Sequence, residues 1–282
     1  MIASPLQVIC AYEFSEEFIA SDNIICPIYI KGAYLRNKQI KNTIKLLKFE
    51  NIREIVVGSE NNKLDNISRI INFLLLRIEI GNSENRLILG DFRDKTMHIA
   101  RIFFRPKNTY IIDDGFASYI ASKNFLSKNI FFPNNNKLLK IFLILFFQYN
   151  YLRKTKIHIF SVYSYLFRGD IFLENNFYNI RKKIIYKDKD YDPNIAFFVG
   201  TKLSERGALS INDEIKILKS SLKYINSIGM ECIYFAKRSS SKTKLDLIEK
   251  LGFKIYIPEY PLEVHLMQIN LRPSLICGFG SS

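Results

Sequence analysis

The pattern of apolar and polar residues along the chain shows two periodicities, one typical of strands and one typical of helices, and the two alternate. Short β-branched runs that end at glycine or at acidic residues indicate strands, and apolar residues three and four positions apart indicate helices. In the first part, strands are expected over residues 24–30, 54–57, 87–89 and 109–112, and helices over 37–48, 66–78 and 94–104. Ser4-Pro5 has the cap and first-turn pattern of a further helix. This alternating order predicts a parallel sheet covered by helices on both faces.

The alternation restarts after a polar stretch, residues 187–193, that ends in proline and is expected to be a linker. Beyond it, strands are expected over 195–199, 232–236, 254–257 and 275–277, and helices over 210–227 and 243–251. Ser210 and Asp213 are spaced like a capping box, and Gly229 is placed to end that helix. The fold class is therefore α/β, with an N-terminal domain over 1–187 and a C-terminal domain over 194–282. Between residues 116 and 186 one strand, 156–162, is clear.

Composition places the chain among globular proteins, since 48% of its 282 residues are hydrophobic and 24% are charged. Apolar runs shorter than the roughly 18 residues of a membrane span, together with the lack of a basic leader, predict a cytoplasmic protein. Four scattered cysteines are expected to be reduced thiols, and three scattered histidines do not form a zinc pattern.

Positive charge is concentrated in residues 116–187, which carry most of the net charge of +14. This segment contains twelve Lys and Arg residues but only two acidic residues, so its net charge is +10. It is also rich in Phe and Tyr. Such a segment suits an anionic membrane surface, a lipid-linked glycan or a nucleic acid. The alternative is a solvated basic face over an aromatic core. Because no nucleic-acid-binding module can be identified, we expect no nucleic acid partner.

The tripeptide Asp113-Asp114-Gly115 closes a predicted strand, which is where catalytic groups lie in open α/β sheets. Adjacent carboxylates raise each other's pKa, and a carboxyl group with a raised pKa can act as a general base. The alternative is a helix cap followed by a turn glycine.

Four groups of motifs resemble the bacterial sialyltransferases of glycosyltransferase family 52, relatives of the polysialyltransferases and of the marine-bacterial sialyltransferases. They are Ser4-Pro5-Leu6-Gln7; Leu89-Gly90-Asp91-Phe92 leading to Asp113-Asp114-Gly115; Phe198-Val199-Gly200-Thr201-Lys202-Leu203-Ser204-Glu205; and Pro261-Leu262-Glu263, Pro273 and Gly278-Phe279-Gly280-Ser281-Ser282. The resemblance spans nearly the whole chain.

The resemblance implies two Rossmann-like domains facing a cleft, the GT-B arrangement, with CMP-sialic acid as donor and no metal or other cofactor. It assigns the general base to Asp114, next to Asp113. Glu263 matches the residue that binds the CMP ribose, and Ser281 and Ser282 match the pair that holds the CMP phosphate.

The chain departs from the family pattern at two places. The family has a histidine after the strand that matches 232–236, whereas Lys237 and then Arg238 stand here. Either cation would neutralise the leaving phosphate, but neither is a good proton donor near neutral pH. Family members also continue past the paired serines with a helix, so we expect that helix to be missing from a chain that stops at Ser282.

The expected function is transfer of sialic acid from CMP-sialic acid to a cell-surface glycan, lipooligosaccharide or capsule, by a peripheral protein on the inner face of the cytoplasmic membrane. One alternative is transfer of another CMP-activated nonulosonic acid. Another is a catalytically impaired remnant that only binds nucleotide or glycan.

Overall fold

The structure is a computed structural model that divides into two compact units, Met1–Lys182 and Lys183–Ser282. It describes residues 1–18, 24–58, 63–80, 86–91, 94–104, 106–113, 115, 118–120, 122–123, 156–185, 190–238, 240–269 and 272–279. Both units are α/β, and every strand pair in the described part of the chain is parallel. The expected fold class is confirmed at this level.

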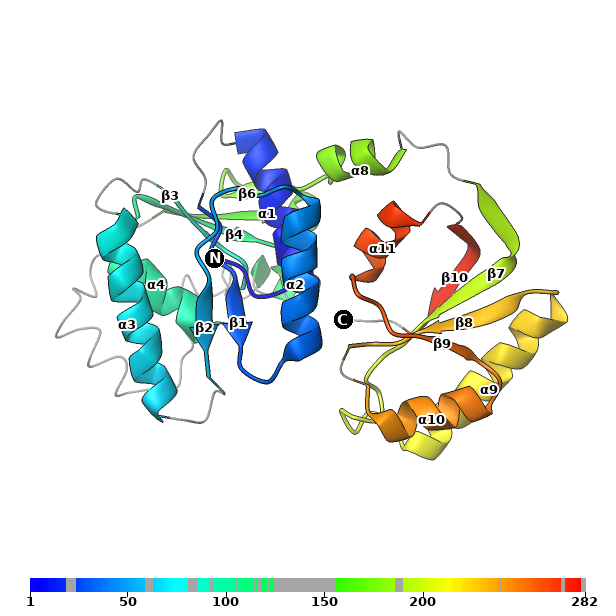
Figure 1. Ribbon diagram of the computed structural model, residues 1–282. Helices are drawn as coiled ribbons and strands as arrows, with labels where there is room; N and C mark the ends of the chain where they lie inside the picture. The colour runs from blue at the N-terminus through cyan, green and yellow to red at the C-terminus, as the bar shows by residue number, and fades with distance from the viewer. Residues whose placement is uncertain are drawn as a thin grey trace. The chain divides into compact units, whose positions relative to one another are not determined.

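The first unit contains two sets of parallel strands (Figure 1). The smaller set pairs β1 (Ile28–Ile30) with β2 (Ile55–Val57). The larger set has the order β3-β4-β5-β6. Its members are β3 (Arg86–Leu89), β4 (Asn108–Ile112), β5 (Lys156–Ser161) and β6 (Phe172–Glu174).

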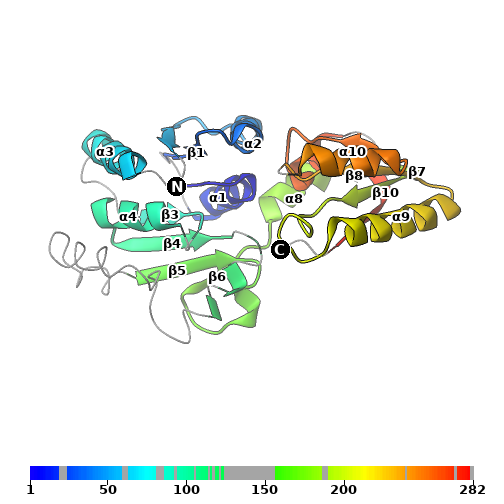
Figure 2. The ribbon, with the colours of Figure 1, turned by 90° about the horizontal axis from the view of Figure 1, so that it is seen from below.

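The first three residues of the chain join these two sets. Ile28 N donates to Ile2 O at 2.8 Å, Met1 N donates to Ile88 O at 2.5 Å, and Gly90 N donates to Met1 O at 2.9 Å. Both sides follow the parallel pattern, so the order across the unit is β2, β1, Met1–Ala3, β3, β4, β5, β6. Counted along the chain this order is 3-2-1-4-5-6-7, which contains the Rossmann order. Figure 2 shows the strands following one another in this way.

Helices cover both faces of this sheet (Figure 2). They are α1 (Pro5–Phe18), α2 (Tyr34–Leu46), α3 (Lys63–Ile80), α4 (Lys95–Phe104) and, after β6, α8 (Tyr178–Ile185). Phe14 of α1 packs against Tyr110 of β4 and Phe160 of β5, with ring centroids 4.9 and 5.3 Å apart. On the other face, Phe73 of α3 and Met97 of α4 belong to a fully buried cluster. The sequence therefore predicted this two-faced arrangement correctly.

Helix α8 was not predicted, and a buried carboxylate explains where it begins. Glu13 of α1 is 1% exposed and accepts hydrogen bonds from the backbone N–H groups of Asn179 and Ile180. These donors have no partner within the helix because they belong to its first turn. A negative charge at this end also interacts favourably with the helix dipole. Glu13, which is distant in sequence, thus caps α8 together with a local residue, since Asn176 Oδ1 accepts a hydrogen bond from Tyr178 N at 2.9 Å.

The second unit has a parallel sheet of order β10-β7-β8-β9. The strands are β7 (Tyr191–Val199), β8 (Glu231–Phe235), β9 (Lys254–Tyr256) and β10 (Arg272–Gly278). In chain order this sequence is 4-1-2-3, so the direction of winding changes between β7 and β10. Helices α9 (Ile211–Ser227), α10 (Lys242–Lys250) and α11 (Leu262–Gln268) connect the strands.

Alternate residues of β7 point to opposite faces of this sheet. Phe198 packs in one core with Leu218 of α9 and Ile248 of α10. Its neighbour Phe197 lies against His265 of α11, with ring centroids 6.0 Å apart. This period of two is what a strand requires, and it places α11 on the face opposite α9 and α10 (Figure 1).

Local signals for α9 are confirmed. Ser210 Oγ accepts a hydrogen bond from Asp213 N at 3.1 Å, as a cap should. Gly229 follows the helix with φ +80°, a conformation that favours glycine.

The prediction of a linker over 187–193 is wrong for its last three residues, because Tyr191–Pro193 belong to β7. These residues pair only with β10, since the pairing with β8 begins at Ile195. Proline is tolerated where one side of a strand is unpaired. Two other expectations differ: β10 is longer than the predicted 275–277, and β1 forms only at the end of the predicted 24–30.

A tight contact where Met1–Ala3 meets β3 gives a first prediction. A Cβ at Gly90 would lie 2.2 Å from Gln7 Oε1, and Gln7 is 2% exposed. That oxygen already accepts a hydrogen bond from Ala3 N at 2.6 Å, so the side chain has no free direction to move. We expect Gly90→Ala to lower the free energy of unfolding by about 1–3 kcal/mol, measured by chemical denaturation.

The matched control is Gly90→Ala in a Gln7→Ala background. There the added methyl group no longer meets the Gln7 side chain and should cost clearly less, so the two substitutions should not be additive. Equal costs in both backgrounds would show that the contact does not constrain Gly90.

Candidate functional site

The carboxyl ends of β4, β5 and β6 meet around one buried carboxylate, Asp113. It directly follows β4 and is 1% exposed. Ser161 Oγ, at the end of β5, donates to Asp113 Oδ1 at 2.5 Å, and Val162 N donates to Oδ2 at 2.7 Å. Asn175 Nδ2, after β6, is 3.5 Å from Oδ2. Asp113 therefore ties three strand ends together at the edge where α/β sheets bind their ligands.

Burial raises the pKa of Asp113 above its ordinary value of 3.8, although hydrogen bonds from Ser161, Val162, Ser118 and Asn175 act in the opposite direction. Because its oxygens are occupied by these donors and closed to solvent, the geometry favours a positioning role for Asp113 over contact with a substrate. The resemblance had assigned the base to Asp114, but the sequence could not show that Asp113 is buried.

The other members of this motif are only partly visible. Asp114 lies outside the described residues. Gly115 has φ +67°, and its carbonyl accepts a hydrogen bond from Ser118 N at 3.0 Å. A side chain is strained in that conformation, so the turn after Asp113 favours glycine.

Ser4, at the end of the first strand segment, acts as the expected helix cap. Its hydroxyl accepts a hydrogen bond from Gln7 N at 3.2 Å. The start of α1 and Gly90 after β3 therefore lie on either side of the point where the winding of the sheet changes direction, a position typical of ligand sites.

In the second unit, glycines follow the two strands at the corresponding point. A Cβ at Gly278, the last residue of β10, would lie 2.9 Å from the Val199 carbonyl oxygen. A Cβ at Gly200, after β7, would lie 2.7 Å from the Tyr234 hydroxyl oxygen. Gly278 therefore lets the end of β10 lie close to the Val199 backbone of β7, and Gly200 leaves room for the Tyr234 side chain of β8.

Positive charges gather beside these strand ends around Lys237, which follows β8 and is half-buried. Partial burial lowers its pKa from the usual 10.5, and repulsion from Arg206, Lys202 and Arg238 lowers it further, with Glu205 opposing. Lys202 and Arg206 come from the loop after β7; Lys202 lies in a quoted motif but was given no role, and Arg206 was not singled out from the sequence. Such a cluster suits a phosphate group, which would offset the repulsion.

A buried lysine holds the loop that carries Lys202 and Arg206. The Lys244 side chain is 1% exposed, and its Nζ lies 2.8 Å from Thr201 O, 3.0 Å from Glu205 Oε2 and 2.6 Å from Glu214 Oε1. Glu214 in turn accepts a hydrogen bond from Ser204 N at 3.0 Å. Glu205, a motif residue in the sequence, therefore has a clear structural role here.

The residues matched to nucleotide binding are described only in part. Glu263 lies exposed in the first turn of α11. Ser281 and Ser282 lie outside the described residues. His265, two residues beyond Glu263, contacts Tyr256 through Nδ1 at 3.2 Å, and burial lowers its pKa below 6.5.

Other site types find little support in the described part of the chain. No group of three or more His, Cys, Asp or Glu residues there could hold a metal ion. None of the described helices is both long and apolar enough to cross a bilayer. The four cysteines are free thiols; Cys10, Cys26 and Cys232 are buried and Cys277 is half-buried.

No model of a known protein family matches the chain, and no curated protein matches it either. Any functional assignment therefore depends on the geometry of these two strand-end sites and on the motifs quoted above.

The burial of Asp113 predicts how stability depends on pH. Its folded-state pKa is raised, so its contribution is fully present below the ordinary pKa of 3.8 and is lost as pH rises through the folded value. Relative to Asp113→Asn, the wild type should lose stability over this window, by up to about 1.4 kcal/mol per pH unit. Chemical unfolding of both proteins at a series of pH values measures the difference.

Ser161→Ala provides the matched test of the cause. The substitution removes the Ser161 hydroxyl group, a donor that lowers the pKa of Asp113. The pH range over which the wild type loses stability relative to the Asn variant should therefore extend to higher pH. The free energy of unfolding of the wild type minus that of Asp113→Asn should fall as pH rises. If this difference is constant or increases with pH, the pKa of Asp113 is not raised in the folded protein.

Proposed function

We propose that the protein is a glycosyltransferase that moves sialic acid from CMP-sialic acid to a cell-surface glycan. The observation that carries this proposal is the cation cluster around Lys237, at the edge of a parallel sheet where β7 and β10 end near Gly200 and Gly278. A nucleotide phosphate is the natural ligand for such a site. The GT-B arrangement, in which two Rossmann-like units face one cleft, is part of the proposal.

In the proposed reaction, Asp114 removes the proton from the acceptor hydroxyl as that oxygen bonds to the anomeric carbon of the sugar. The bond from that carbon to the CMP phosphate breaks, and CMP leaves with the electron pair. Asp113 fixes the strand end from which Asp114 follows. Lys237 and Arg238 stabilise the charge on the leaving phosphate, which requires no metal ion.

Glu263 would bind the CMP ribose, and Ser281 and Ser282 the phosphate, as the resemblance implies. A lipid-linked acceptor would bring the protein to the inner face of the cytoplasmic membrane. The basic segment 116–187 would then face the anionic lipids, although residues 124–155 of it lie outside the described part.

A second candidate is a protein that binds the nucleotide but transfers poorly. Lys237 favours this alternative, because an ammonium among other cations holds charge well but is a weak proton donor unless its pKa falls close to neutral. Another CMP-activated nonulosonic acid as donor remains a variant of the first proposal.

Nucleotide binding is tested with CMP by isothermal titration calorimetry. Lys237→Gln should weaken CMP binding by about tenfold to a hundredfold, the value of a charge-assisted hydrogen bond. It should not destabilise the free protein, because it relieves repulsion from Arg206, Lys202 and Arg238. The control is Lys219→Gln, an exposed lysine on α9. If both variants bind CMP as tightly as the wild type, the cluster is not the phosphate site.

Transfer is tested by product formation from CMP-sialic acid and a lipooligosaccharide acceptor. Asp114→Asn should lower turnover by roughly 10²–10⁴-fold while CMP affinity is retained, because only the proton transfer is removed. The control is Asp170→Asn, an exposed acid in a loop of the same unit. Near-wild-type turnover of Asp114→Asn would refute the assignment of the base, and a wild type that binds CMP without forming product would favour the second candidate.

A further inference from the structure

Four aromatic rings of the first unit pack together near the carboxyl ends of β4 and β5. Tyr163 and Phe167 belong to the loop after β5, Phe172 begins β6, and Tyr119 comes from the segment after β4. The ring centroids are 5.9 Å apart for Tyr119 and Tyr163, 5.8 Å for Tyr119 and Phe167, and 5.1 Å for Phe167 and Phe172. These are distances of packed aromatic pairs. The four residues are called the ring cluster below.

Hydrogen bonds to Asp113 fix both segments that carry these rings. On one side, the Ser161 hydroxyl and the Val162 N–H group donate to the Asp113 carboxylate immediately before the loop. On the other side, the side chain of Ser118 also bonds to Asp113, and Tyr119 is the next residue. The ring cluster therefore stands at the same strand ends as the candidate acidic site.

A short turn bonded to the ring cluster presents two large apolar side chains to solvent. This 3-10 helix, η1 (Ser164–Leu166), has three residues per turn, and its first residue is buried. Tyr165 and Leu166 consequently point outward, and they are 72% and 50% exposed. Leu166 N donates to Tyr163 O at 3.0 Å. The exposed ring is thus held on a packed aromatic base before any ligand arrives.

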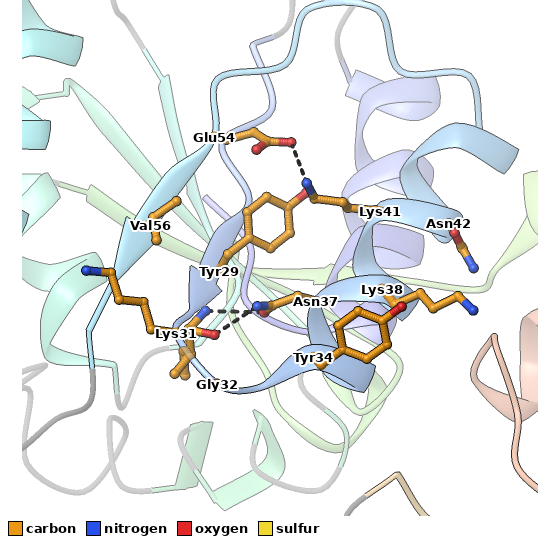
Figure 3. A pocket seen from close by; sticks show the side chains of 11 residues that line it. Tyr29, Lys31, Gly32, Tyr34, Asn37, Lys38, Lys41, Asn42, Glu54 and Val56 are labelled. Carbon is orange, nitrogen blue, oxygen red and sulfur yellow. Dashed lines mark hydrogen bonds and ion pairs between the residues drawn. The ribbon is translucent and has the colours of Figure 1, made fainter.

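The Tyr165 ring differs in this respect from a tyrosine ring elsewhere in the unit. Figure 3 shows a pocket between β1, β2 and α2 in which Tyr29 is already covered. Lys41 Nζ lies 4.9 Å from the centre of that ring and 3.4 Å from Glu54 Oε1. Tyr165 has no hydrogen bond or ring contact with another side chain in the part of the chain that the structure describes. Its ring is therefore open to a ligand.

Charge favours a neutral ligand at η1. The loop over 162–171 contains one cation, Arg168, and one anion, Asp170, so it has no net charge, although the larger segment 116–187 is strongly basic. A lipid surface or a nucleic acid is typically bound by an excess of cations. A sugar needs no charge, because it combines hydroxyl groups with an apolar ring face that an aromatic side chain can cover.

We propose that Tyr165, supported by the ring cluster, binds a neutral sugar ring of a saccharide. The sugar packs its apolar face on Tyr165 beside Leu166. Tyr165 lies three residues beyond Val162, which bonds to Asp113, so the two Cα atoms are at most about 11 Å apart, roughly two sugar units. Since Asp114 directly follows Asp113, another part of the same saccharide can reach the proposed base. This role in holding the acceptor rests on the proposed transferase function, whereas binding of the sugar does not.

The test is direct binding by saturation-transfer NMR titration, with lactose as probe and sorbitol as comparison. Both compounds carry hydroxyl groups, but only lactose has rings with an apolar face. Lactose should bind with a Kd on the order of 1 mM, and sorbitol at least about tenfold more weakly.

Variants locate the subsite. Tyr165→Ala should weaken lactose binding by about fivefold to tenfold, whereas Tyr165→Phe, which keeps the ring, should bind lactose as the wild type does. The matched control is Tyr224→Ala on α9, a tyrosine of similar exposure in the other unit, which should have no effect. All of these are surface positions, where substitutions usually change stability little.

Turnover separates this inference from the proposed function. With CMP-sialic acid and a lipooligosaccharide acceptor, Tyr165→Ala should raise the acceptor KM by about the same fivefold to tenfold, with kcat and CMP affinity close to those of the wild type. A wild type that binds lactose through Tyr165 but forms no product would contradict the proposed function and support the subsite.

Four results would overturn the proposal: equal lactose affinity in Tyr165→Ala and Tyr224→Ala, Tyr165→Phe binding as weakly as Tyr165→Ala, sorbitol binding as tightly as lactose, or no lactose binding at concentrations on the order of 10 mM. A lipid partner is tested with phosphatidylglycerol vesicles. If Tyr165→Ala associates with them less than Tyr224→Ala does, the ring faces a membrane and the sugar assignment is wrong.

Discussion

The first unit depends on one short segment, Met1–Ala3, inserted between β1 and β3. Its backbone bonds to both neighbours turn two separate sets of strands into one sheet. The carboxyl ends of all these strands then lie on a single edge, where Asp113 and Ser4 are found. The insertion also brings α1 against Gly90 so closely that the buried Gln7 side chain occupies the space of a missing Cβ. Backbone pairing therefore determines where side-chain chemistry can gather.

In the second unit, the buried ammonium group of Lys244 joins separate segments of the chain. The Lys244 ammonium has three oxygen partners, from the end of β7, the following loop and α9. The contacts with Thr201 and Glu205 are hydrogen bonds, and the contact with Glu214 is an ion pair. Removing one partner would leave an uncompensated charge in the interior, which is far more costly than the pair is stabilising. The loop that presents Lys202 and Arg206 is consequently held by electrostatics rather than by apolar packing.

The sequence could predict what depends on local periodicity and left out what depends on distant partners. Apolar spacing identified most helices and strands, and Ser210 and Gly229 marked the ends of α9 because caps are local. Met1–Ala3 is too short to show a periodicity, and it acts as a strand only because it pairs with β1 and β3, which come later in the chain. Helix α8 depends in the same way on Glu13, more than 160 residues earlier.

For the candidate sites too, the sequence showed the local motifs but not the partners that come from distant parts of the chain. The acidic pair after β4 was visible in the sequence, but the burial of Asp113 was not, because Ser161 and Asn175 come from later strands. No role could be assigned to Lys202, Arg206 or Lys244 from the sequence, since only the fold brings their partners to them.

The crowding of cations around Lys237 also has a thermodynamic consequence for the second unit. Like charges held close together raise the free energy of the folded form, and an anion that settles among them removes that penalty. A ligand that binds only the folded form shifts the folding equilibrium by mass action. The melting temperature of this unit should therefore rise with the concentration of any anion that binds there, including the nucleotide of the proposed function.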